Sequence, residues 1–334
     1  MLIFNDESSI HYYSDIHKVI ILGNIKLPGP LMLAPIAGFT DSPFRRVARR
    51  HGAGLTVTEL ISAEGIIRHH RKTMELARFH EEERPIAIQL FGNKPDLMAE
   101  AAGVVGEILR PDIIDINLGC PARRICNSGS GAALLLVPEK VRAIASAMVQ
   151  RVEIPVTAKI RIGWDSDSLT YRDIIRALED GGVSLIFVHG RTRAQQYGGT
   201  SDWDIIRELV SISKVPVIGN GDIRTHPDAF ERMKFSSCPA VMIGRGAIGN
   251  PWIFSGYQPS IRQVVDQINE HLDMMIEYYG ERGIVLMRKH IVKYLHAFNG
   301  ARHARQQVVI AKSKDEVNCI LELLVNLGDD SNVI

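Results

Sequence analysis

Hydrophobic residues form short unbroken runs along the first three quarters of the chain, and most runs are followed by a helical pattern. The run Leu31 to Gly38 has no polar position, which is typical of a strand buried on both faces. Eight runs are predicted to be strands: 31–38, 55–59, 85–91, 113–117, 155–161, 184–189, 215–219 and 240–243. Eight strands in this strand–loop–helix order predict an α/β fold, a closed parallel (β/α)8 TIM barrel, rather than an open doubly wound sheet.

Two segments depart from this alternation. Residues 20–27 are two apolar runs joined by Gly23-Asn24, which predicts a β-hairpin. After Pro251 the strand pattern stops, and apolar residues recur at helical spacing from about residue 260 to residue 327. We therefore predict a barrel over residues 1–256, with the hairpin in segment 1–30, and an all-helical C-terminal domain over residues 257–334.

Composition excludes several classes of protein. Of the 334 residues 46% are hydrophobic and 23% are charged, which is ordinary for a globular protein, and a net charge of +1 means that any nucleic-acid surface must come from local clustering. Four cysteines without framework spacing suit a reducing cytoplasm, and no His/Cys cluster in the sequence suggests a metal site. With neither a signal peptide nor a long apolar run, we expect a cytoplasmic protein without a membrane partner.

The loop after the fourth predicted strand presents a cysteine. Cys120 stands between Gly119 and Pro121, in a position where this type of barrel holds reactive groups. Arg123 and Arg124 follow closely, and they would favour a thiolate or steer an anionic substrate. The alternative is that Cys120 is a small buried hydrophobic residue, which is the usual role of a free cysteine.

Nearly every predicted strand ends in a small or hydrogen-bonding residue, and in a closed barrel these ends meet at one mouth. These residues are Gly38, Glu59, Gln89, Asn117, Lys159, Arg161, His189, Asn220, Asp222, Gly244 and Arg245. Lys159 and Arg161 are two positions apart and therefore point to the same side of their strand, which suggests an anion or an electron-rich ring as ligand. His189 would orient a carbonyl or a heterocycle, although a strand-end histidine can also serve packing alone.

Two glycine turns follow the last two predicted strands, Gly219–Asp222 and Gly244–Gly246. In this fold those loops are the usual phosphate site, because they expose backbone N–H groups. The alternative is two tight turns without a ligand. A phosphate site, a lysine and amides at one mouth suit flavin mononucleotide (FMN), with Lys159 near the isoalloxazine ring and with Gln89 and Asn117 at its pyrimidine edge.

These motifs resemble the tRNA-dihydrouridine synthases, and among them most closely the bacterial B-type enzymes. The matching segments are Ala34–Gly38, Thr40–Arg45, Gln89–Gly92, Asp115–Pro121, Lys159–Arg161, His189–Arg193, Gly219–Asp222, Gly244–Gly246 and Met287–Tyr294. The most specific of them are Asn117–Pro121 and His189–Arg193. Two positions are unusual: Arg124 stands where many relatives have lysine, and Cys126 is not part of the motif.

The resemblance implies NADPH-dependent reduction of uridine in tRNA to 5,6-dihydrouridine through FMN. Hydride would pass from flavin N5 to uracil C6, and Cys120 would protonate C5 from the opposite face, after the base has left the tRNA fold. The implied cofactor-binding residues are Ala34, Pro35, Ile36, Gln89, Lys159, His189, Asn220, Gly221, Asp222, Gly244 and Arg245. The implied substrate-binding residues are Asn117, Arg161, Arg191, Tyr197, Arg288, Lys289 and Lys293. We expect a monomer without a metal.

The helical tail gathers basic and aromatic residues, which fits a tRNA-binding role in which phosphate contacts supply affinity and position. The basic residues are Arg282, Arg288, Lys289, His290, Lys293, Arg302, His303 and Arg305, and Tyr278, Tyr279, Tyr294 and Phe298 lie between them. On composition alone a solvated helix face is an equal alternative. Two other functions stay open: an FMN-dependent oxidoreductase acting on free pyrimidines, and an RNA-binding protein that has lost catalysis.

Overall fold

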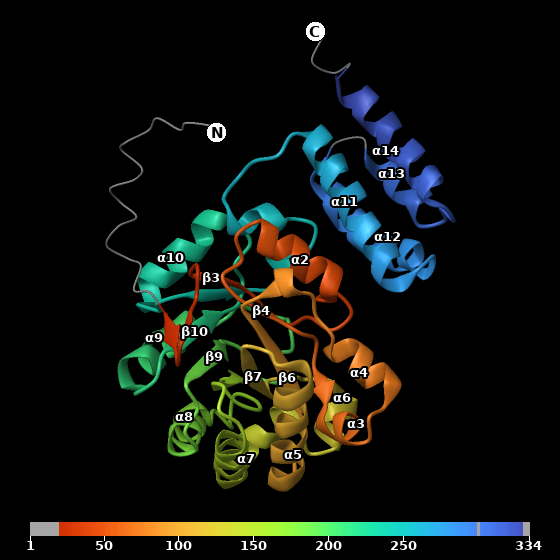
Figure 1. Ribbon diagram of the computed structural model, residues 1–334. Coiled ribbons are helices and arrows are strands. Elements are labelled where there is room, and N and C mark those ends of the chain that lie inside the picture. Colours follow the sequence, from red (N-terminus) through yellow and green to blue (C-terminus); the bar gives the residue numbers. More distant parts are fainter. Residues whose placement is uncertain (1–19, 299–300, 330–334) are drawn as a thin grey trace.

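The computed structural model describes residues 20–298 and 301–329, and it shows a parallel barrel with a helical domain (Figure 1). The strands run in the order β3-β11-β10-β9-β8-β7-β6-β4, and every neighbouring pair that is registered is parallel. Their bounds are β3 (Leu31–Leu33), β4 (Thr56–Val57), β6 (Ile86–Phe91), β7 (Ile113–Leu118), β8 (Val156–Arg161), β9 (Leu185–His189), β10 (Val217–Asn220) and β11 (Val241–Ile243). The predicted eight-stranded barrel is therefore confirmed.

Backbone hydrogen bonds join the first and second barrel strands and so close the barrel. Leu33 N–H donates to Leu55 O at 2.9 Å, and Gly54 N–H donates to Leu31 O at 2.7 Å. A short extra strand, β5 (Ile61–Ser62), pairs with the end of β6.

Helices connect the strands and cover the outside of the barrel (Figure 1). They are α2 (Ser42–Arg50), α3 (Ala63–Ile67), α4 (Arg71–Ala77), α5 (Pro95–Val104), α6 (Arg123–Asn127), α7 (Pro138–Arg151), α8 (Tyr171–Asp180), α9 (Trp203–Ile212) and α10 (His226–Ser236). The Ala/Leu-rich run from Gly131 predicts a helix, but Gly131–Leu136 forms a 3₁₀ segment, which is followed by the separate α7. The break arises because Pro138 disfavours helical backbone angles at Val137, whose φ and ψ are −137° and 74°.

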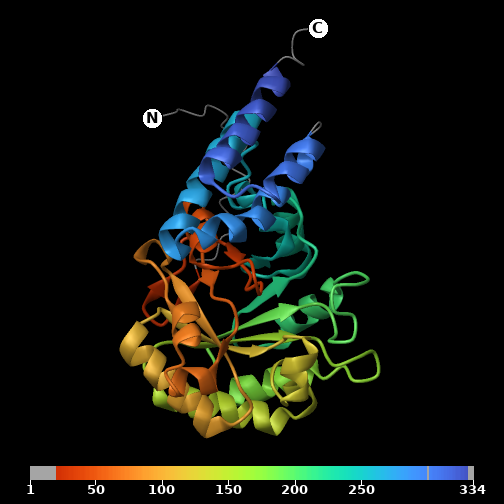
Figure 2. The same cartoon turned by 90° about the vertical axis from the view of Figure 1, so that its right-hand side faces the viewer.

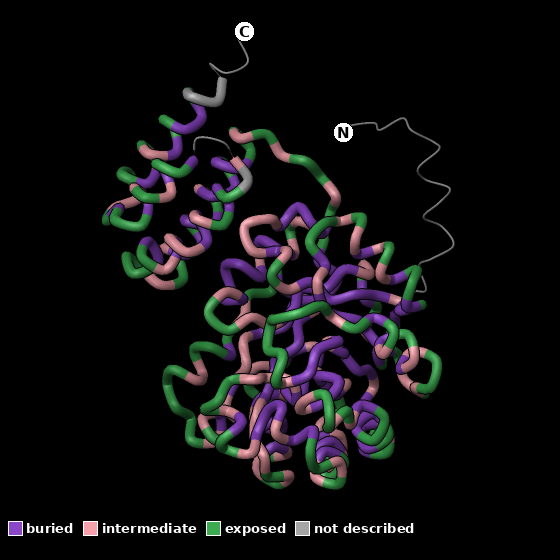
Figure 3. Tube along the Cα trace, turned by 180° about the vertical axis from the view of Figure 1, so that it is seen from behind, coloured by how far each residue is buried: buried purple, intermediate pink, exposed green. Residues whose placement is uncertain are grey.

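Buried residues lie on both sides of the barrel wall (Figure 3). Inside, residues such as Phe187 and Met242 pack with Ile20, Leu22 and Leu27, which belong to or flank the hairpin of β1 (Ile21–Leu22) and β2 (Ile25–Lys26). The hairpin therefore closes the end of the barrel at which the strands begin. The prediction for residues 1–19 of segment 1–30 lies outside the described residues.

The helical domain contains α11 (Ile261–Tyr279), α12 (Arg282–Tyr294), α13 (Ala301–Val308) and α14 (Lys314–Asp329). It stands at one end of the barrel (Figure 2) and contacts it through α11 and α2. Trp252 of the preceding 3₁₀ segment packs into its core. No helix within 20–298 or 301–329 combines the length and apolar character needed to cross a bilayer.

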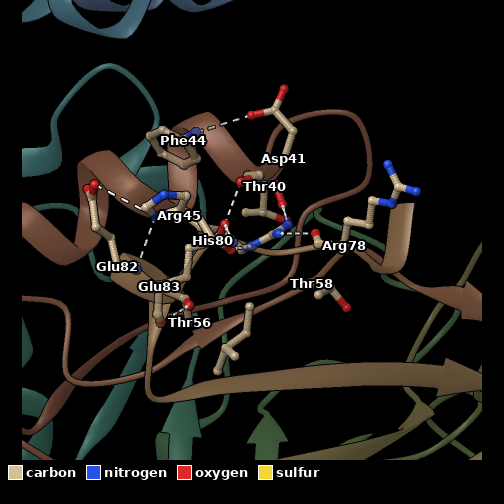
Figure 4. A network of polar contacts seen from close by, with 12 residues as sticks. Thr40, Asp41, Phe44, Arg45, Thr56, Thr58, Arg78, His80, Glu82 and Glu83 are labelled. Carbon is tan, nitrogen blue, oxygen red and sulfur yellow. Dashed lines mark hydrogen bonds and ion pairs between the residues drawn. The ribbon is translucent and has the colours of Figure 1, made fainter. Parts of the chain in front are cut away.

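A buried ion pair fixes the start of α2 (Figure 4). Arg45 Nε donates to Glu83 Oε2 at 2.5 Å, and the two side chains are 2% and 0% exposed. The Arg45 guanidinium also donates to Thr40 O at 2.6 Å and to Arg78 O at 3.1 Å, while Glu83 accepts from the Ser42 hydroxyl. The pair therefore holds the loop after β3 against the segment before β6.

We predict that Glu83→Gln lowers the free energy of unfolding by about 3–5 kcal/mol, because it leaves the buried Arg45 cation without a counter-charge. Urea unfolding at pH 7 measures this change. Glu75→Gln, which removes the exposed Arg71–Glu75 pair on α4, is the matched control and should leave the unfolding midpoint unchanged. Equal effects of the two substitutions would contradict the prediction.

Candidate active site

A cavity of about 1130 Å³ opens where the barrel strands end, and it contains most of the predicted site residues. The predicted residues that line it are Ala34, Pro35, Ile36, Gln89, Asn117, Cys120, Lys159, Arg161, His189, Tyr197, Asn220, Gly221, Asp222, Gly244, Arg245 and Lys293. Three predicted substrate-binding residues, Arg191, Arg288 and Lys289, are not part of its lining.

A chain of buried polar side chains leads to the cysteine loop. The Asp115 carboxylate accepts from Gln89 Nε2 at 2.7 Å and from Thr157 Oγ1 at 2.6 Å. Gln89 Oε1 accepts from Asn117 Nδ2 at 2.6 Å, and Asn117 Oδ1 accepts from the backbone N–H of Cys120 at 3.0 Å. The position of the Cys120 backbone therefore depends on amides that are oriented from the barrel interior.

Cys120 is half-buried in this loop and lines the cavity. Burial raises the pKa of its thiol above the ordinary value of 9.0, and this effect outweighs the hydrogen bond from the Ala122 backbone. The group is therefore a thiol at neutral pH. The expectation that Arg123 and Arg124 produce a thiolate is not met, because burial dominates and both arginines are exposed.

Cys126, which the sequence left unexplained, lies in the short α6 next to the same loop. It is 8% exposed, and its Sγ donates to Cys120 O at 3.4 Å. It belongs to the hydrophobic core outside the barrel. Cys126 therefore supports the backbone of the cysteine loop from behind.

Lys159 lies beside Asn117 in the neighbouring strand, and its Nζ donates to Asn220 Oδ1 at 2.9 Å. Burial, and next the positive charge of Arg161, lower the Lys159 pKa from 10.5 to about 7. Asn220 is held in turn, because its Nδ2 donates to Met242 O at 2.7 Å. The ammonium group is thus fixed over the cavity, and an anion bound beside it would favour its charged form.

Arg161 is almost fully buried and satisfies its donors on the surrounding loops. It donates from Nε to Gly119 O and from Nη1 to Thr192 O and Gln196 O, each at 2.8 Å. Burial lowers its pKa from 12.5 to about 10, so it remains a cation at neutral pH. Arg161 therefore connects the cysteine loop with the loop after β9.

His189 ends β9 and is flanked by cations. Burial, with Lys159 and Arg161 as the next causes, lowers its pKa well below 6.5, so the ring is neutral. Its Nε2 lies 3.4 Å from Arg191 Nη1. Since a guanidinium can only donate, Nε2 accepts this bond, and the proton of the neutral ring is on Nδ1.

Arg191 is 1% exposed and supports the adjacent loops instead of facing the cavity. Its Nη2 lies 2.7 Å from Asp222 Oδ2 and donates at the same distance to Gly199 O. Asp222 also pairs with Arg245 at 3.2 Å, which explains a carboxylate next to the predicted phosphate loops. The substrate-binding role predicted for Arg191 therefore has no support from its position.

The two glycine turns come together at the cavity. A β-carbon on Gly246 would lie 2.4 Å from Ile223 O, so this approach of the two loops requires glycine. One on Gly244 would point toward Ala34 and Ile36, which line the cavity, at 3.7 and 3.8 Å. Arg245 is exposed and lies over the Tyr197 ring at 5.1 Å. The two glycine turns, the Arg245 guanidinium beside them and the cavity next to Gly244 together fit a cofactor that has a phosphate group and a ring.

The basic tail is only partly on the surface. Lys293 and His296 are exposed and line the cavity mouth, whereas His290 and Tyr294 are fully buried in the helical domain. Arg288 donates to Ala311 O at 2.5 Å inside that domain. Lys289 donates to Gly38 O and lies 5.2 Å over the Phe39 ring, so it joins α12 to the loop after β3.

Sequence reasoning missed several residues that build the site. Asp115 and Thr157 lie two residues before Asn117 and Lys159 on the same strands. Because side chains two positions apart on a strand point to the same side, this spacing could have identified both of them. Leu60, Arg224, Ile248 and His296 also line the cavity, but they come from loops and from the helical domain, where no strand-end rule applies.

Solved structures share the barrel. The chain resembles 2-naphthoyl-CoA reductase in complex with 2-naphthoyl-CoA, with a TM-score of 0.58 and 12% identity over 73% of this chain and 52% of that one. It also resembles the TcOYE–pHBA complex, with a TM-score of 0.55 and 12% identity over 75% of this chain and 96% of that one. At this identity the likeness shows the fold alone.

Sequence relatives extend over most of the chain. A probable tRNA-dihydrouridine synthase of Rickettsia prowazekii is 37% identical, covering 88% of this chain and 94% of the relative. tRNA-dihydrouridine synthase B of Pseudomonas aeruginosa is 38% identical over 87% and 91%, and that of Pasteurella multocida is 35% identical over 86% and 93%. The profile of the dihydrouridine synthase (Dus) family matches residues 32–327. The chain therefore belongs to the dihydrouridine synthase family of enzymes.

Proposed function

We propose that this chain reduces uridines of tRNA to 5,6-dihydrouridine with FMN as its cofactor and NADPH as the electron donor. The observation that carries the proposal is the position of Cys120, which lines the cavity and whose backbone N–H is held by the chain of hydrogen bonds from Asp115. Burial raises the pKa of its thiol, which favours the protonated form. Reduction of the uracil C5–C6 bond needs one hydride and one proton, and this thiol is a fitting source of the proton. The names of the relatives support tRNA as substrate.

The residues of the cavity suit FMN. The glycine turns and Arg245 would hold the phosphate, and Lys159 would place its ammonium beside the ring. His189, with its proton on Nδ1, would donate to a carbonyl of the ring system or of the base. When bound, FMN would carry hydride from NADPH to C6 of the uracil.

Cys120 would act as the general acid. Its thiol donates a proton to C5 of the uracil while hydride arrives at C6, and the resulting thiolate regains a proton from solvent. Arg161 holds Gly119 O and so keeps the cysteine loop in place. The nearby cation of Arg161 would limit the cost of the transient negative charge on the thiolate.

The helical domain, residues 257–334 in our division, would bind the tRNA. Lys293 and His296 reach the cavity mouth from α12 and the segment after it, beside the place where a flipped base would enter. Arg282, Arg302 and His303 are exposed on the same domain and offer phosphate contacts. Because Arg288 and Lys289 bond within the protein, we expect them to support this surface indirectly.

We expect the protein, working as a cytoplasmic monomer, to purify with a flavin absorbance spectrum. After reduction with NADPH, uridine-bearing tRNA should reoxidise the flavin, whereas free uridine should not. Reoxidation by free pyrimidines would favour the small-molecule oxidoreductase, and a protein without flavin would favour an RNA-binding protein that has lost catalysis.

We predict that Cys120→Ser binds flavin normally but forms dihydrouridine about 10²–10⁴-fold more slowly, because the hydroxyl is a far weaker acid than the thiol. Single-turnover reoxidation by tRNA measures this rate. The matched control is Cys319→Ser, which alters an exposed thiol on α14 and should retain the wild-type rate. Full activity of Cys120→Ser would remove the thiol from the mechanism.

We predict that Lys159→Met lowers the reduction potential of the bound flavin by roughly 30–60 mV, because a charged hydrogen bond to the reduced ring is lost. The Lys159 pKa is about 7, so below that pH the side chain is charged and stabilises the reduced flavin. The difference in potential between wild type and Lys159→Met should therefore become smaller as the pH rises above 7. The potential would be titrated from pH 6 to pH 8. Lys293→Met, at the mouth, is the control. Unchanged potentials in Lys159→Met would place the ammonium away from the flavin ring.

A further inference from the structure

Three buried side chains meet where the barrel contacts the helical domain. Asp41 precedes α2, His271 lies on α11 and His290 lies on α12. One ligand atom from each lies within 4.8 Å of the other two. None of the three lines the catalytic cavity.

The two histidines have nitrogen atoms without partners. Both side chains are 0% exposed, and His271 Nε2, His290 Nδ1 and His290 Nε2 make no hydrogen bond. Buried polar atoms are normally bonded, so a group of orphaned nitrogens facing a carboxylate requires an explanation. A bound cation would satisfy one nitrogen of each ring and would be balanced by the Asp41 carboxylate.

The rings have the arrangement that two ligands of one ion would have. Their centroids are 4.8 Å apart, with 60° between the ring planes. Two imidazoles on one tetrahedral zinc, with Zn–N of about 2.0–2.1 Å, place their centroids roughly 5 Å apart. The ligand atoms themselves would have to close slightly, since adjacent donors on such an ion lie roughly 3.4 Å apart.

The outer partners that such ligands need are also in place. His271 Nδ1 lies 3.2 Å from the Tyr294 hydroxyl, which leaves Nε2 as the free atom. Asp41 Oδ1 accepts from Phe44 N–H at 3.2 Å, a bond drawn in Figure 4. Asp41 Oδ2 accepts only a long bond of 3.5 Å from the Tyr279 hydroxyl, which leaves a lone pair on that oxygen for an ion. A second bond that orients the ligand is usual at protein metal sites. Phe39 and Phe44 pack on the His290 ring and exclude water from that side.

We propose that Asp41, His271 and His290 bind one divalent transition-metal ion, with zinc as the best match to two imidazoles and one carboxylate. A second cavity, of about 230 Å³, is lined by Asp41 and Tyr279 and would supply both an entry path and a fourth, water ligand. The sequence suggested no metal, because these residues are some 230 and 19 positions apart and form no motif.

Burial and neighbouring charges act on the three proposed ligands. Burial raises the Asp41 pKa to about 6 and lowers that of His271 to about 3, and the His290 pKa also falls well below 6.5. Burial thus favours the neutral imidazoles, which is the form in which a ring nitrogen binds a metal. Lys289 and Arg45 add positive charge nearby and Glu59 adds negative charge, while the Lys289 ammonium is engaged with Gly38 O.

The ion would join the two domains. Asp41 belongs to the loop that also carries Gly38 and Phe39, and His290 lies on the helix that carries Lys289 and Lys293. Binding would therefore fix the exposed Lys293 relative to the barrel mouth. This inference is independent of the proposed reaction, because it concerns residues outside the catalytic cavity.

The test uses the purified full-length protein. Metal content is measured by plasma mass spectrometry after growth with added zinc. The metal-stripped protein is then titrated with Co²⁺, whose tetrahedral d–d bands lie at longer wavelength than the main flavin absorbance. We expect one ion per chain, and saturation at one equivalent of Co²⁺. Asp41→Asn, which keeps the capping bond to Phe44 N–H, should weaken Co²⁺ binding at least about tenfold.

His303→Gln, which changes an exposed histidine on α13, is the control and should bind Co²⁺ as the wild type does. Far-ultraviolet circular dichroism of the stripped variants separates lost binding from lost folding. Substoichiometric metal together with the absence of a cobalt band in the folded wild-type protein would overturn the proposal. Wild-type affinity in folded Asp41→Asn would also overturn it, since the ion would then lie on other ligands.

Discussion

The buried carboxylate of Asp115 is the constraint on which the active site depends. Its register partners are Gln89 on β6 and Thr157 on β8, so three side chains on adjacent strands point to one side of the barrel wall. Burial raises the Asp115 pKa to about 6, against the two hydrogen bonds and Lys159, which lower it. Ionised, this carboxylate can only accept, so it fixes the Gln89 amide, which fixes Asn117 and then the Cys120 backbone.

The rigid interior of the barrel thus positions the loop that carries Cys120. Asn117 and Arg161, both on barrel strands, bond the backbone of the cysteine loop at Cys120 and Gly119. The position of the loop therefore depends on strands whose register is set by the whole barrel. A change of one position in the β6–β7 register would turn Gln89 away from Asp115 and release Asn117. Catalytic geometry and barrel stability are therefore linked through the same three strands.

The sequence predicted the elements well and the partners of its polar residues less well. Buried parallel strands are readable because both faces are apolar, so their ends and the residues there could be placed. The sequence could not predict the contacts of Arg191 and Arg288, which bond to backbone carbonyls. A long arginine side chain can reach several loops, and nothing in the sequence distinguishes an arginine that binds a ligand from one that binds backbone. The sequence pattern places His290 and Tyr294 in the predicted tRNA-binding set, yet both are buried, because charge and aromaticity do not reveal which face of a helix is packed. The meeting of Asp41 with His271 and His290 is a tertiary event without a local signature.

The electrostatics of the mouth separate two kinds of residue. Arg161 stays charged despite a pKa lowered to about 10 and donates to backbone carbonyls, whereas Arg245 is exposed and pairs with Asp222. Lys159 has a pKa of about 7 and Cys120 is a thiol with a raised pKa, so their protonation responds to what is bound. An anionic ligand would favour the charged lysine, and the Arg161 cation would favour the thiolate that the proposed proton transfer leaves behind. In the proposed reaction, burial would keep the Cys120 thiol protonated beforehand, and the fixed charge of Arg161 would reduce the cost of its deprotonation.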